Sequence, residues 1–587
     1  MMPKTGHPCP DTPTPWAVAR PGTAAGGTAP PGASRLAGVP ASPGAAVGPV
    51  ARMAAPPTPP ERAPAAEDPA AEADRARAAL ESVARWLDAR AAGLTGDGAA
   101  VLTAQALMAR DPELARRIGE RTEAGQAAAR AVHSAVGAYQ ELLLAAGGYL
   151  AERAADLADV RDRAVAVLLD EPMPGLPDPG HDHVLVADDL APADTVQLDA
   201  DRVLAIVTRR GGPTSHTVIL ARSLGIPAVV GCAGADGLRD GTAVAVDGDA
   251  GTVDVDPGAD LVERIRHRAE HRRSLLAEST GPGRTRDGFP VALLLNVGEG
   301  DPGEAAALDG EGVGLLRTEF LFLDRAEPPT VDEQTAVYTR LLDAFSGRVV
   351  TVRTLDAGSD KPLPFVRTGP EDNPALGVRG YRTARDQPGL LTDQLTAISR
   401  AVRATGTRTR VMAPMVSTPA EAADFAALAR AAGIGEVGVM VEVPGAALLA
   451  DRLLPHVDFV SIGTNDLAQY TMAADRTLGS LPELLDPWQP ALLSLVASVG
   501  RSGERLGRPV GVCGEAAADP LLALVLVGAG ASSLSMSGPA LPAVRHALAR
   551  HTRSDCVRLA EAALAEPGAE RARQAARAAA NPRTALW

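Results

Sequence analysis

The chain has 587 residues and a formal net charge of -15 at pH 7. This length predicts three or four domains with substantial cores. Since only 3% of the residues are aromatic, we expect these cores to be mainly aliphatic. The acidic balance argues against general affinity for nucleic acid or for an anionic membrane surface, although a local arginine cluster can still bind an anionic substrate.

The cysteine pattern indicates a reducing compartment. The four cysteines, Cys9, Cys232, Cys513 and Cys556, form no CxxC pair and no disulfide-like spacing. We therefore expect a cytoplasmic protein. No apolar run reaches the roughly 18 residues of a membrane span, and the N-terminus lacks the apolar core of a signal peptide, so we expect no direct membrane insertion.

The first third of the chain contains three segments that differ in composition and residue pattern. Residues 1–33 are rich in Pro, Gly, Thr and Ala, which predicts a disordered tail. Residues 34–53 have the β-branched and Pro/Gly pattern of a short strand with turns. Residues 54–169 begin with a Pro/Ala-rich linker and continue with apolar residues at helical spacing, as at Leu80 and Val83. No strand pattern interrupts this spacing, so we expect an all-helical domain.

Residues 170–257 read as short strands separated by Asp/Gly turns, which predicts a compact β/α domain. Within it, the strand pattern Val203–Val207 is followed by a glycine turn and by a helical pattern that begins near His216. Glycine allows close backbone approach, and the unpaired N–H groups of a helix start favour an anion. A lone histidine there is more often a capping or packing residue, so the local pattern leaves both interpretations open.

The second half of the chain alternates between strand and helix patterns. Residues 258–290 predict a charged linker helix and a Gly/Pro/Arg hinge, which suits a domain that moves. Eight β/α units follow in residues 291–551, the pattern of a (β/α)8 TIM barrel whose chemistry lies at the carboxyl ends of its strands. Residues 552–587 read as a charged Ala/Arg-rich helix and tail. The expected strands are Val291–Val297, Gly312–Arg317, Val349–Thr354, Arg410–Met415, Val437–Val441, Asp458–Ile462, Pro509–Val512 and Ser533–Met536.

Charged residues gather at these strand ends. Arginine forks match phosphate and carboxylate oxygens, so Arg317, Arg353 and Arg476 are suited to a small, highly charged phosphorylated acid. Glu442 and Asp466 offer hard oxygen ligands that, with substrate oxygens and waters, could complete an octahedral Mg²⁺ site. Any one of these residues could belong to a structural ion pair, but their joint placement at the strand ends favours a binding site for the substrate and metal.

Several segments resemble the phosphoenolpyruvate (PEP)-utilising enzymes, a family that includes enzyme I of the sugar phosphotransferase system, PEP synthase and pyruvate phosphate dikinase. The stretch around His216 reads GGPTSHTVI and continues with AR and IPAVVG. The barrel segments are similar to those of enzyme I, and the resemblance covers roughly residues 34 to 550. The similar barrel segments are residues 316–322, 353–361, 373–379, 440–444, 461–476 and 511–515.

The resemblance implies a role for each matching position. It makes His216 the phosphorylated residue and Cys513 the proton donor. Two departures, Ser359 in place of a glycine and Gly445 in place of an alanine, keep the side chain small. The implied PEP ligands are Arg317, Arg353, Asn465 and Arg476, with Asp466, Lys361 and Arg379 in the same substrate site, and the implied Mg²⁺ ligands are Glu442 and Asp466.

The resemblance also implies a domain plan and an activity. Residues 34–53 and 170–257 would form one discontinuous, swivelling phosphohistidine domain, and the inserted helices would dock the phosphocarrier protein HPr. Asp111–Leu114 and Glu152–Asp156 are similar to enzyme I segments, whereas Ala104–Ala109 lacks a histidine common there. The implied reaction transfers the phosphoryl group of PEP to His216 and then to HPr, releasing pyruvate, as the first step of sugar uptake. A homodimer through the barrel is expected.

Two alternatives stay open. An ATP-coupled PEP synthase or dikinase would need a nucleotide-binding region of roughly 200–350 residues, and no glycine-rich ATP loop precedes His216. A non-catalytic regulatory protein on the same scaffold would be expected to lose the Arg, Glu, Asp and Cys residues of the site, and this set is intact in the sequence.

Overall fold

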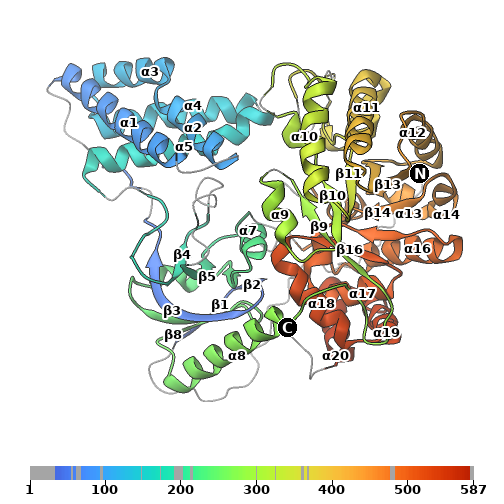
Figure 1. Cartoon of the computed structure of the whole chain (residues 1–587). Helices are drawn as coiled ribbons and strands as arrows, with labels where there is room; N and C mark the ends of the chain where they lie inside the picture. The colour runs from blue at the N-terminus through green and yellow to red at the C-terminus, as the bar shows by residue number, and fades with distance from the viewer. Residues whose placement is uncertain are drawn as a thin grey trace, which may run out of the picture.

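The fold was analysed in a computed structural model that describes the following residues: 34–54, 57–60, 68–92, 97–146, 148–171, 174–190, 198, 202–211, 216–298, 300–323, 325–358, 363–366, 369, 371–475, 481 and 483–581. Figure 1 shows a group of helices, a separate sheet and a barrel. The predicted disordered tail lies outside the described residues. Among the described helices, none is long and apolar enough to cross a membrane.

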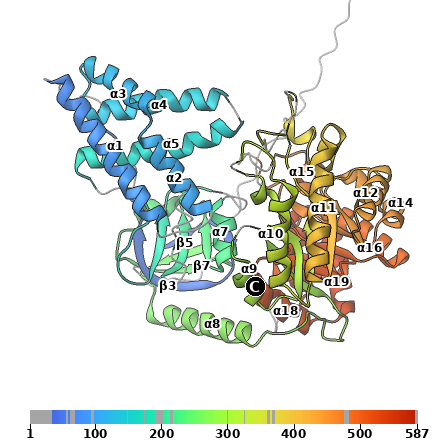
Figure 2. The same cartoon turned by 45° about the horizontal axis from the view of Figure 1, so that its top comes forward.

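The helical part lies next to the sheet in both views (Figures 1 and 2). Asp68 directly precedes helix α1, and its carboxylate accepts hydrogen bonds from the N–H groups of Ala70 and Ala71 and so caps the helix. The helices share an aliphatic core that includes Val83 and Val132. The part consists of α1 (Pro69–Ala91), α2 (Asp97–Ala109), α3 (Pro112–Glu123), α4 (Ala128–Ala146) and α5 (Gly148–Leu169).

An 8-stranded sheet joins segments from both sides of these helices in the sequence, in the order β1-β8-β7-β3-β4-β5-β6-β2. Val50 of β3 lies opposite Val184 of β4 in a parallel pair, and Val47 lies opposite Ala245 of β7 in an antiparallel pair. Residues before and after the helical part therefore form one sheet. Its strands are β1 (Arg35–Ala37), β2 (Val39–Ser42), β3 (Ala45–Arg52), β4 (His183–Ala187), β5 (Val203–Thr208), β6 (Ala228–Val230), β7 (Ala243–Asp247) and β8 (Thr252–Val255).

Two helices accompany the sheet. Helix α7 (His216–Leu224) follows β5 in the sequence. Helix α8 (Ala259–Ala277) packs against β3, and its Arg268 pairs with Asp247 of β7 at 2.6 Å. The predicted linker helix is thus attached to the sheet by an ion pair.

The second half of the chain forms a closed barrel of eight strands, each hydrogen-bonded in parallel to its neighbours. Every strand overlaps the run predicted for it, and the multidomain α/β fold class with a TIM barrel is confirmed. The strands are β9 (Ala292–Val297), β10 (Gly312–Leu316), β11 (Val349–Arg353), β12 (Thr409–Ala413), β13 (Glu436–Val441), β14 (Phe459–Ile462), β15 (Val510–Val512) and β16 (Ser533–Met536).

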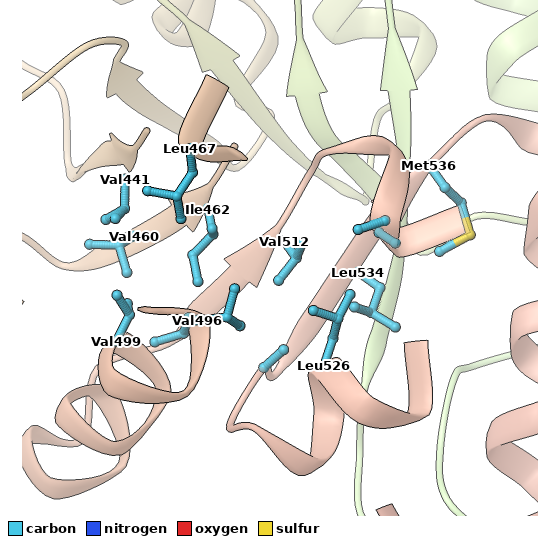
Figure 3. Packing of buried hydrophobic residues seen from close by; sticks show 14 of the residues in the cluster. Val441, Val460, Ile462, Leu467, Val496, Val499, Val512, Leu526, Leu534 and Met536 are labelled. Atoms are coloured by element: carbon cyan, nitrogen blue, oxygen red, sulfur yellow. The ribbon is translucent and has the colours of Figure 1, made fainter. Parts of the chain in front are cut away.

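Helices surround the barrel and cover the apolar outer faces of its strands. Figure 3 shows Val460 and Ile462 of β14 beside Val496 and Val499, and all four side chains are almost fully buried. The helices are α9 (Pro302–Ala307), α10 (Val331–Ala344), α11 (Pro388–Thr405), α12 (Pro419–Ala431), α13 (Pro444–Leu448), α14 (Ala450–Leu453), α15 (Thr464–Met472), α16 (Pro490–Leu506), α17 (Pro520–Gly528) and α18 (Leu541–Arg550).

The end of the chain differs from the expected single helix and tail. It forms two helices, α19 (Arg553–Leu564) and α20 (Ala569–Ala579), and both contact α17. Cys556 and Leu559 of α19 are buried in the same core as the barrel helices. Their spacing of three residues puts them on one helix face. The barrel core therefore continues beyond the boundary predicted at residue 551.

Candidate active site

The carboxyl ends of the barrel strands form a mouth in which most of the predicted site residues meet. Arg353 ends β11, while Arg317, Glu442 and Cys513 directly follow β10, β13 and β15. Asp466 lies in the first turn of α15, just after β14. Since the carboxyl ends of all eight strands lie at one end of a parallel barrel, these residues share one site.

A chain of buried ion pairs crosses this mouth. Arg353 contacts Glu319 through Nη2 and Oε2 at 2.9 Å, and Asp356 through Nη1 and Oδ2 at 3.3 Å. Arg379 holds both oxygens of Asp356 at 3.0 Å and contacts Asp466 Oδ1 with Nη1, also at 3.0 Å. Arg379 is 1% exposed and Asp356 0%. The network fixes Asp466 and Arg353 relative to each other, because buried charges are held by their partners.

Sequence reasoning did not assign Asp356 or Glu319 to the site. Both stand in the motifs that were recognised, and Asp356 follows Arg353 by three residues. That short spacing is the available signal, since an acid next to an arginine at a strand end indicates an ion pair.

Two arginine side chains offer donors at the mouth. Within the described structure, Arg353 Nε is buried and has no hydrogen-bond partner. Burial alone would lower the pKa of Arg353, but the charges of Glu319 and Asp356 raise it, so the guanidinium stays charged. Arg317 stands at the rim, exposed to solvent, where partial desolvation and the charge of Arg353 lower its pKa. An anion bound between the two guanidinium groups would relieve their repulsion.

Glu442 and Asp466 form the acidic side of the mouth. Glu442 is 1% exposed, and its Oε2 accepts a hydrogen bond from the Met415 N–H at 2.9 Å. A side chain at Gly463 would collide with Glu442, since its Cβ would lie 2.6 Å from Oε1. Burial and then the charge of Asp466 raise the pKa of Glu442. A divalent cation between the two carboxylates would offset this repulsion, so the pair fits a metal site.

The described residues offer only part of a metal coordination shell. No group of three or more His, Cys, Asp or Glu side chains is arranged there to hold a metal ion. Two carboxylates would leave positions for substrate oxygens and water, which is how Mg²⁺ is commonly bound. The arrangement therefore fits the expected Mg²⁺, with the substrate as part of its shell.

Cys513 lies at the floor of the mouth and is 4% exposed. Its Sγ is 3.6 Å from the carbonyl oxygen of Ile462, and apolar side chains that include Met412 and Met440 surround it. Burial raises the pKa of the Cys513 thiol to about 11. The thiol consequently keeps its proton at neutral pH, as a proton donor must.

Asn465 is held at the rim by Glu515, a residue that the sequence did not single out. The Asn465 amide donates from Nδ2 to Glu515 Oε1 at 3.2 Å, and the Glu515 N–H donates to Asn465 Oδ1 at 3.3 Å. The two bonds fix the amide. Lys361 and Arg476 lie outside the described residues.

His216 is the first residue of α7, as the sequence pattern predicted, and its side chain lies outside the described structure. The next residue, Thr217, is fully buried and its hydroxyl donates to Asp189 Oδ1 at 3.1 Å. Helix α7 contacts the short 3-10 helix η7 (Gly538–Ala540), which follows β16. Because β16 ends at the mouth, α7 lies at the same end of the barrel as the charged residues.

The comparisons with known proteins agree with this arrangement. Three family models match in succession: "PEP-utilising enzyme, N-terminal" over residues 37–153, "PEP-utilising enzyme, mobile domain" over 179–251, and "PEP-utilising enzyme, PEP-binding domain" over 273–553. The chain belongs to the PEP-utilising enzyme family. The resemblance inferred from the sequence motifs is thereby confirmed.

Curated relatives within the family match along most of the chain. The chain is 52% identical to the phosphoenolpyruvate-protein phosphotransferase of Streptomyces coelicolor, over 92% of this chain and 98% of that protein. It is 41% identical to the protein of the same name from Haloferax volcanii, over 83% of this chain and 88% of the relative. A multiphosphoryl transfer protein of Xanthomonas campestris is 38% identical, over 93% of this chain and 67% of that protein.

Proposed function

We propose that this enzyme transfers the phosphoryl group of PEP to its own His216 and then to HPr, with release of pyruvate, as the first step of sugar uptake by the phosphotransferase system. The observation that carries the proposal is the barrel mouth. It combines a buried Arg353–Asp356–Arg379–Asp466 network with the carboxylate of Glu442. Such a site suits a small, highly charged anion that binds together with a divalent metal.

Arg317 and Arg353 would bind the phosphate and carboxylate oxygens of PEP, together with Arg476 and the Asn465 amide. Among the described residues Arg353 Nε has no hydrogen-bond partner, so it is a donor that a substrate oxygen could use. Because Asp356 holds Arg353 and Arg379 together, the guanidinium of Arg353 needs little rearrangement on binding. Arg379 acts as a supporting residue, and Lys361 is assigned the same role.

Glu442 and Asp466 would hold Mg²⁺, and Asp466 would also lie against the substrate. A bound Mg²⁺ supplies charge that stabilises the phosphoryl group during transfer. Met415 and Arg379 orient the two carboxylates by hydrogen bonds. These contacts keep the acidic side of the mouth in place before the substrate arrives.

In the chemical step, a neutral imidazole nitrogen of His216 attacks the phosphorus of PEP, and the bond between phosphorus and the enol oxygen breaks. The departing enolate then takes the Cys513 thiol proton at its methylene carbon, which gives pyruvate. Burial in the floor of the mouth supports this role, since it keeps the thiol protonated.

Transfer to HPr requires the sheet and α7 to leave the mouth. The contact between α7 and η7 supports a loading position at the barrel. The helical part, α1 to α5, is the proposed dock for HPr, and the swivelling body would carry the phosphoryl group between the two. A homodimer through the barrel is part of the same proposal.

The test incubates the full-length enzyme with radiolabelled PEP, Mg²⁺ and HPr, and follows protein labelling and pyruvate release in parallel. Wild-type enzyme should label HPr, and His216→Ala should label neither itself nor HPr. His183→Ala, at a buried histidine of β4 in the same sheet, is the matched control and should keep labelling. Labelling of the His216→Ala enzyme would refute the assigned nucleophile, and labelling from ATP would favour the synthase alternative.

A further inference from the structure

A buried glutamine on a barrel helix reaches the strand ends that carry two of the site arginines. Gln394 lies in the second turn of α11 and is 1% exposed. Its buried neighbours on the helix, such as Leu395 and Ile398, belong to the apolar core. A buried amide costs free energy unless its polar atoms find partners. The partners of Gln394 therefore indicate what this side chain holds in place.

Both ends of the Gln394 amide are hydrogen-bonded. Its Oε1 accepts from the N–H of Leu355, just after β11, at 2.9 Å. Its Nε2 donates to the hydroxyl of Thr318, just after β10, at 3.1 Å, and to the hydroxyl of Tyr338 on α10 at 2.9 Å. Since a backbone N–H can only donate, the amide oxygen has to face Leu355, and the orientation of the amide is fixed.

Thr318 extends this connection to the backbone of Arg353. Its hydroxyl, in a residue that is 0% exposed, donates to the Arg353 carbonyl oxygen at 3.0 Å. Thr318 directly follows Arg317, and Leu355 follows Arg353 by two residues. The strands β10 and β11 are hydrogen-bonded neighbours in the barrel. The amide thus fixes the separation of the two backbone segments that carry the arginines.

A second connection between the same two loops is of a different kind. Glu319 Oε1 accepts from the Asp356 N–H at 3.0 Å, and its Oε2 pairs with Arg353 Nη2 at 2.9 Å. This connection uses the guanidinium that a bound anion would engage, so it can change when a substrate arrives. The hydrogen bonds of Gln394 end on uncharged groups. They can therefore persist in the free and the occupied site.

The amide acts against the repulsion between the two arginines. Arg317 and Arg353 carry like charges, and the charge of Arg353 contributes to the lowered pKa of Arg317. Without an anion between them, this repulsion favours their separation. Backbone segments that are tied together keep both guanidinium groups near one site. Donors that are held in place before binding lose less conformational entropy when the ligand binds.

We propose that Gln394 is a positioning residue that holds Arg317 and Arg353 at the spacing required by a phosphorylated acid. The inference rests on the proposed function, in which both arginines bind PEP. Gln394 does not touch the substrate and acts through Thr318 and Leu355. Without its amide, both arginines remain but are less well ordered, so PEP should bind more weakly.

The test measures the dissociation constant of PEP by isothermal titration calorimetry with Mg²⁺. The parent is full-length enzyme with His216→Ala, which should bind PEP without consuming it. Adding Gln394→Met, which keeps the length of the side chain but removes its hydrogen bonds, should raise the Kd roughly 10-fold or more, because two long side chains must then be ordered on binding. Gln334→Met is the matched control and should leave the Kd unchanged. Gln334 of α10 is also 1% exposed, and it donates to the carbonyl oxygen of Pro329 at 3.0 Å.

Two substitutions at Thr318 distinguish positioning from a general loss of stability. Thr318→Ser keeps the hydroxyl and should bind PEP like the parent, whereas Thr318→Val keeps the shape and should weaken binding. With His216 intact and HPr in excess, Gln394→Met and Thr318→Val should raise the KM for PEP in pyruvate release with little change in kcat. A partly unfolded sample would instead lower kcat at an unchanged KM.

The outcomes separate the positioning role from the proposed function. If the parent binds PEP and Gln394→Met binds it with the same Kd, the positioning role is overturned and the proposed function stands. The same conclusion follows if Gln334→Met weakens binding as much as Gln394→Met. If Gln394→Met does not fold, the Thr318 pair decides, and equal binding by Thr318→Ser and Thr318→Val overturns the role. If PEP neither binds the parent nor labels wild-type His216, the proposed function itself fails.

Discussion

Arg379 and Asp466 form a buried ion pair, with 3.0 Å between Nη1 and Oδ1. The same guanidinium holds Asp356 with its other nitrogens, so one cation neutralises two carboxylates in the interior of the mouth. The ion pair with Arg379 thus fixes the orientation of the Asp466 carboxylate on the acidic side of the mouth. The predictions below begin with this pair.

Arg379→Met should destabilise the barrel strongly. It leaves Asp356 and Asp466 buried without their shared cation, and loss of one partner from a buried ion pair costs about 3–5 kcal/mol in the free energy of unfolding. Urea unfolding measures this change. The control is Arg385→Met, at a 71% exposed side chain that pairs with Glu421 at 2.8 Å, and it should cost less than about 1 kcal/mol. Equal effects of the two substitutions would contradict the structural role given to Arg379.

Glu442→Gln should impair the loading step, which is the metal-dependent phosphorylation of His216 by PEP, and should leave transfer from His216 to HPr intact. The amide keeps the shape of the side chain but loses its charge, so labelling of His216 by PEP should fall by roughly 100-fold or more, as expected for loss of metal stabilisation. His216 that has already been phosphorylated should still pass its phosphoryl group to HPr. Glu436→Gln, at the opposite end of β13, is the control and should leave loading intact. A Glu442→Gln enzyme that loads at the wild-type rate would exclude Glu442 as a metal ligand.

The cysteines described in the structure should resist alkylation at pH 8. Burial raises the pKa of Cys513 to about 11 and that of Cys556 to about 12, and it also raises the pKa of Cys232. Because a raised pKa favours the neutral thiol and only the thiolate is nucleophilic, iodoacetamide should react slowly until the pH approaches these values. Peptide mapping by mass spectrometry, with urea-unfolded chain as the reference, gives the rate at each site. Rapid labelling of native Cys513 at pH 8 is the contrary result.

Leu559→Ala should show that α19 is part of the barrel core. Leu559 is 0% exposed, and truncation of a buried leucine costs about 2–5 kcal/mol. Thermal unfolding of the full-length enzyme should therefore begin at a lower temperature. Leu506→Ala removes a leucine that is 39% exposed and should have a much smaller effect. If both variants unfold alike, α19 contributes nothing to the core.

The barrel and the main charged residues could be predicted from the sequence because the strands are marked by runs of Val, Ile and Leu, and the catalytic chemistry of such a barrel lies where these runs end. Arg353, Glu442 and Cys513 were identified in this way. The link from Arg379 to Asp356 could not be predicted, since a long loop brings Arg379 back to the mouth and no local pattern records where a loop returns.

The burial of the C-terminal helices could not be predicted from the sequence for a different reason. Helices α19 and α20 bury mainly alanines together with Cys556 and Leu559. An alanine-rich helix face differs little in hydrophobicity from the exposed face of the same helix. The sequence pattern therefore indicated a helix but did not indicate that one of its faces is buried. The three N-terminal strands were expected as one short strand with turns for a related reason. Pro and Gly interrupt the runs, and the strands are defined by their pairing with β4, β6, β7 and β8.

Strands β3 and β4 are hydrogen-bonded neighbours, although α1 to α5 lie between them in the chain. The polypeptide therefore departs from the sheet and re-enters it at the adjacent position, so the excursion breaks no backbone pairing. The segment between β3 and β4 can therefore change in length or be replaced during evolution without disrupting the pairing of these two strands. If α1 to α5 bind the phosphoryl acceptor, as proposed above, that binding surface can change without disturbing the sheet that precedes His216.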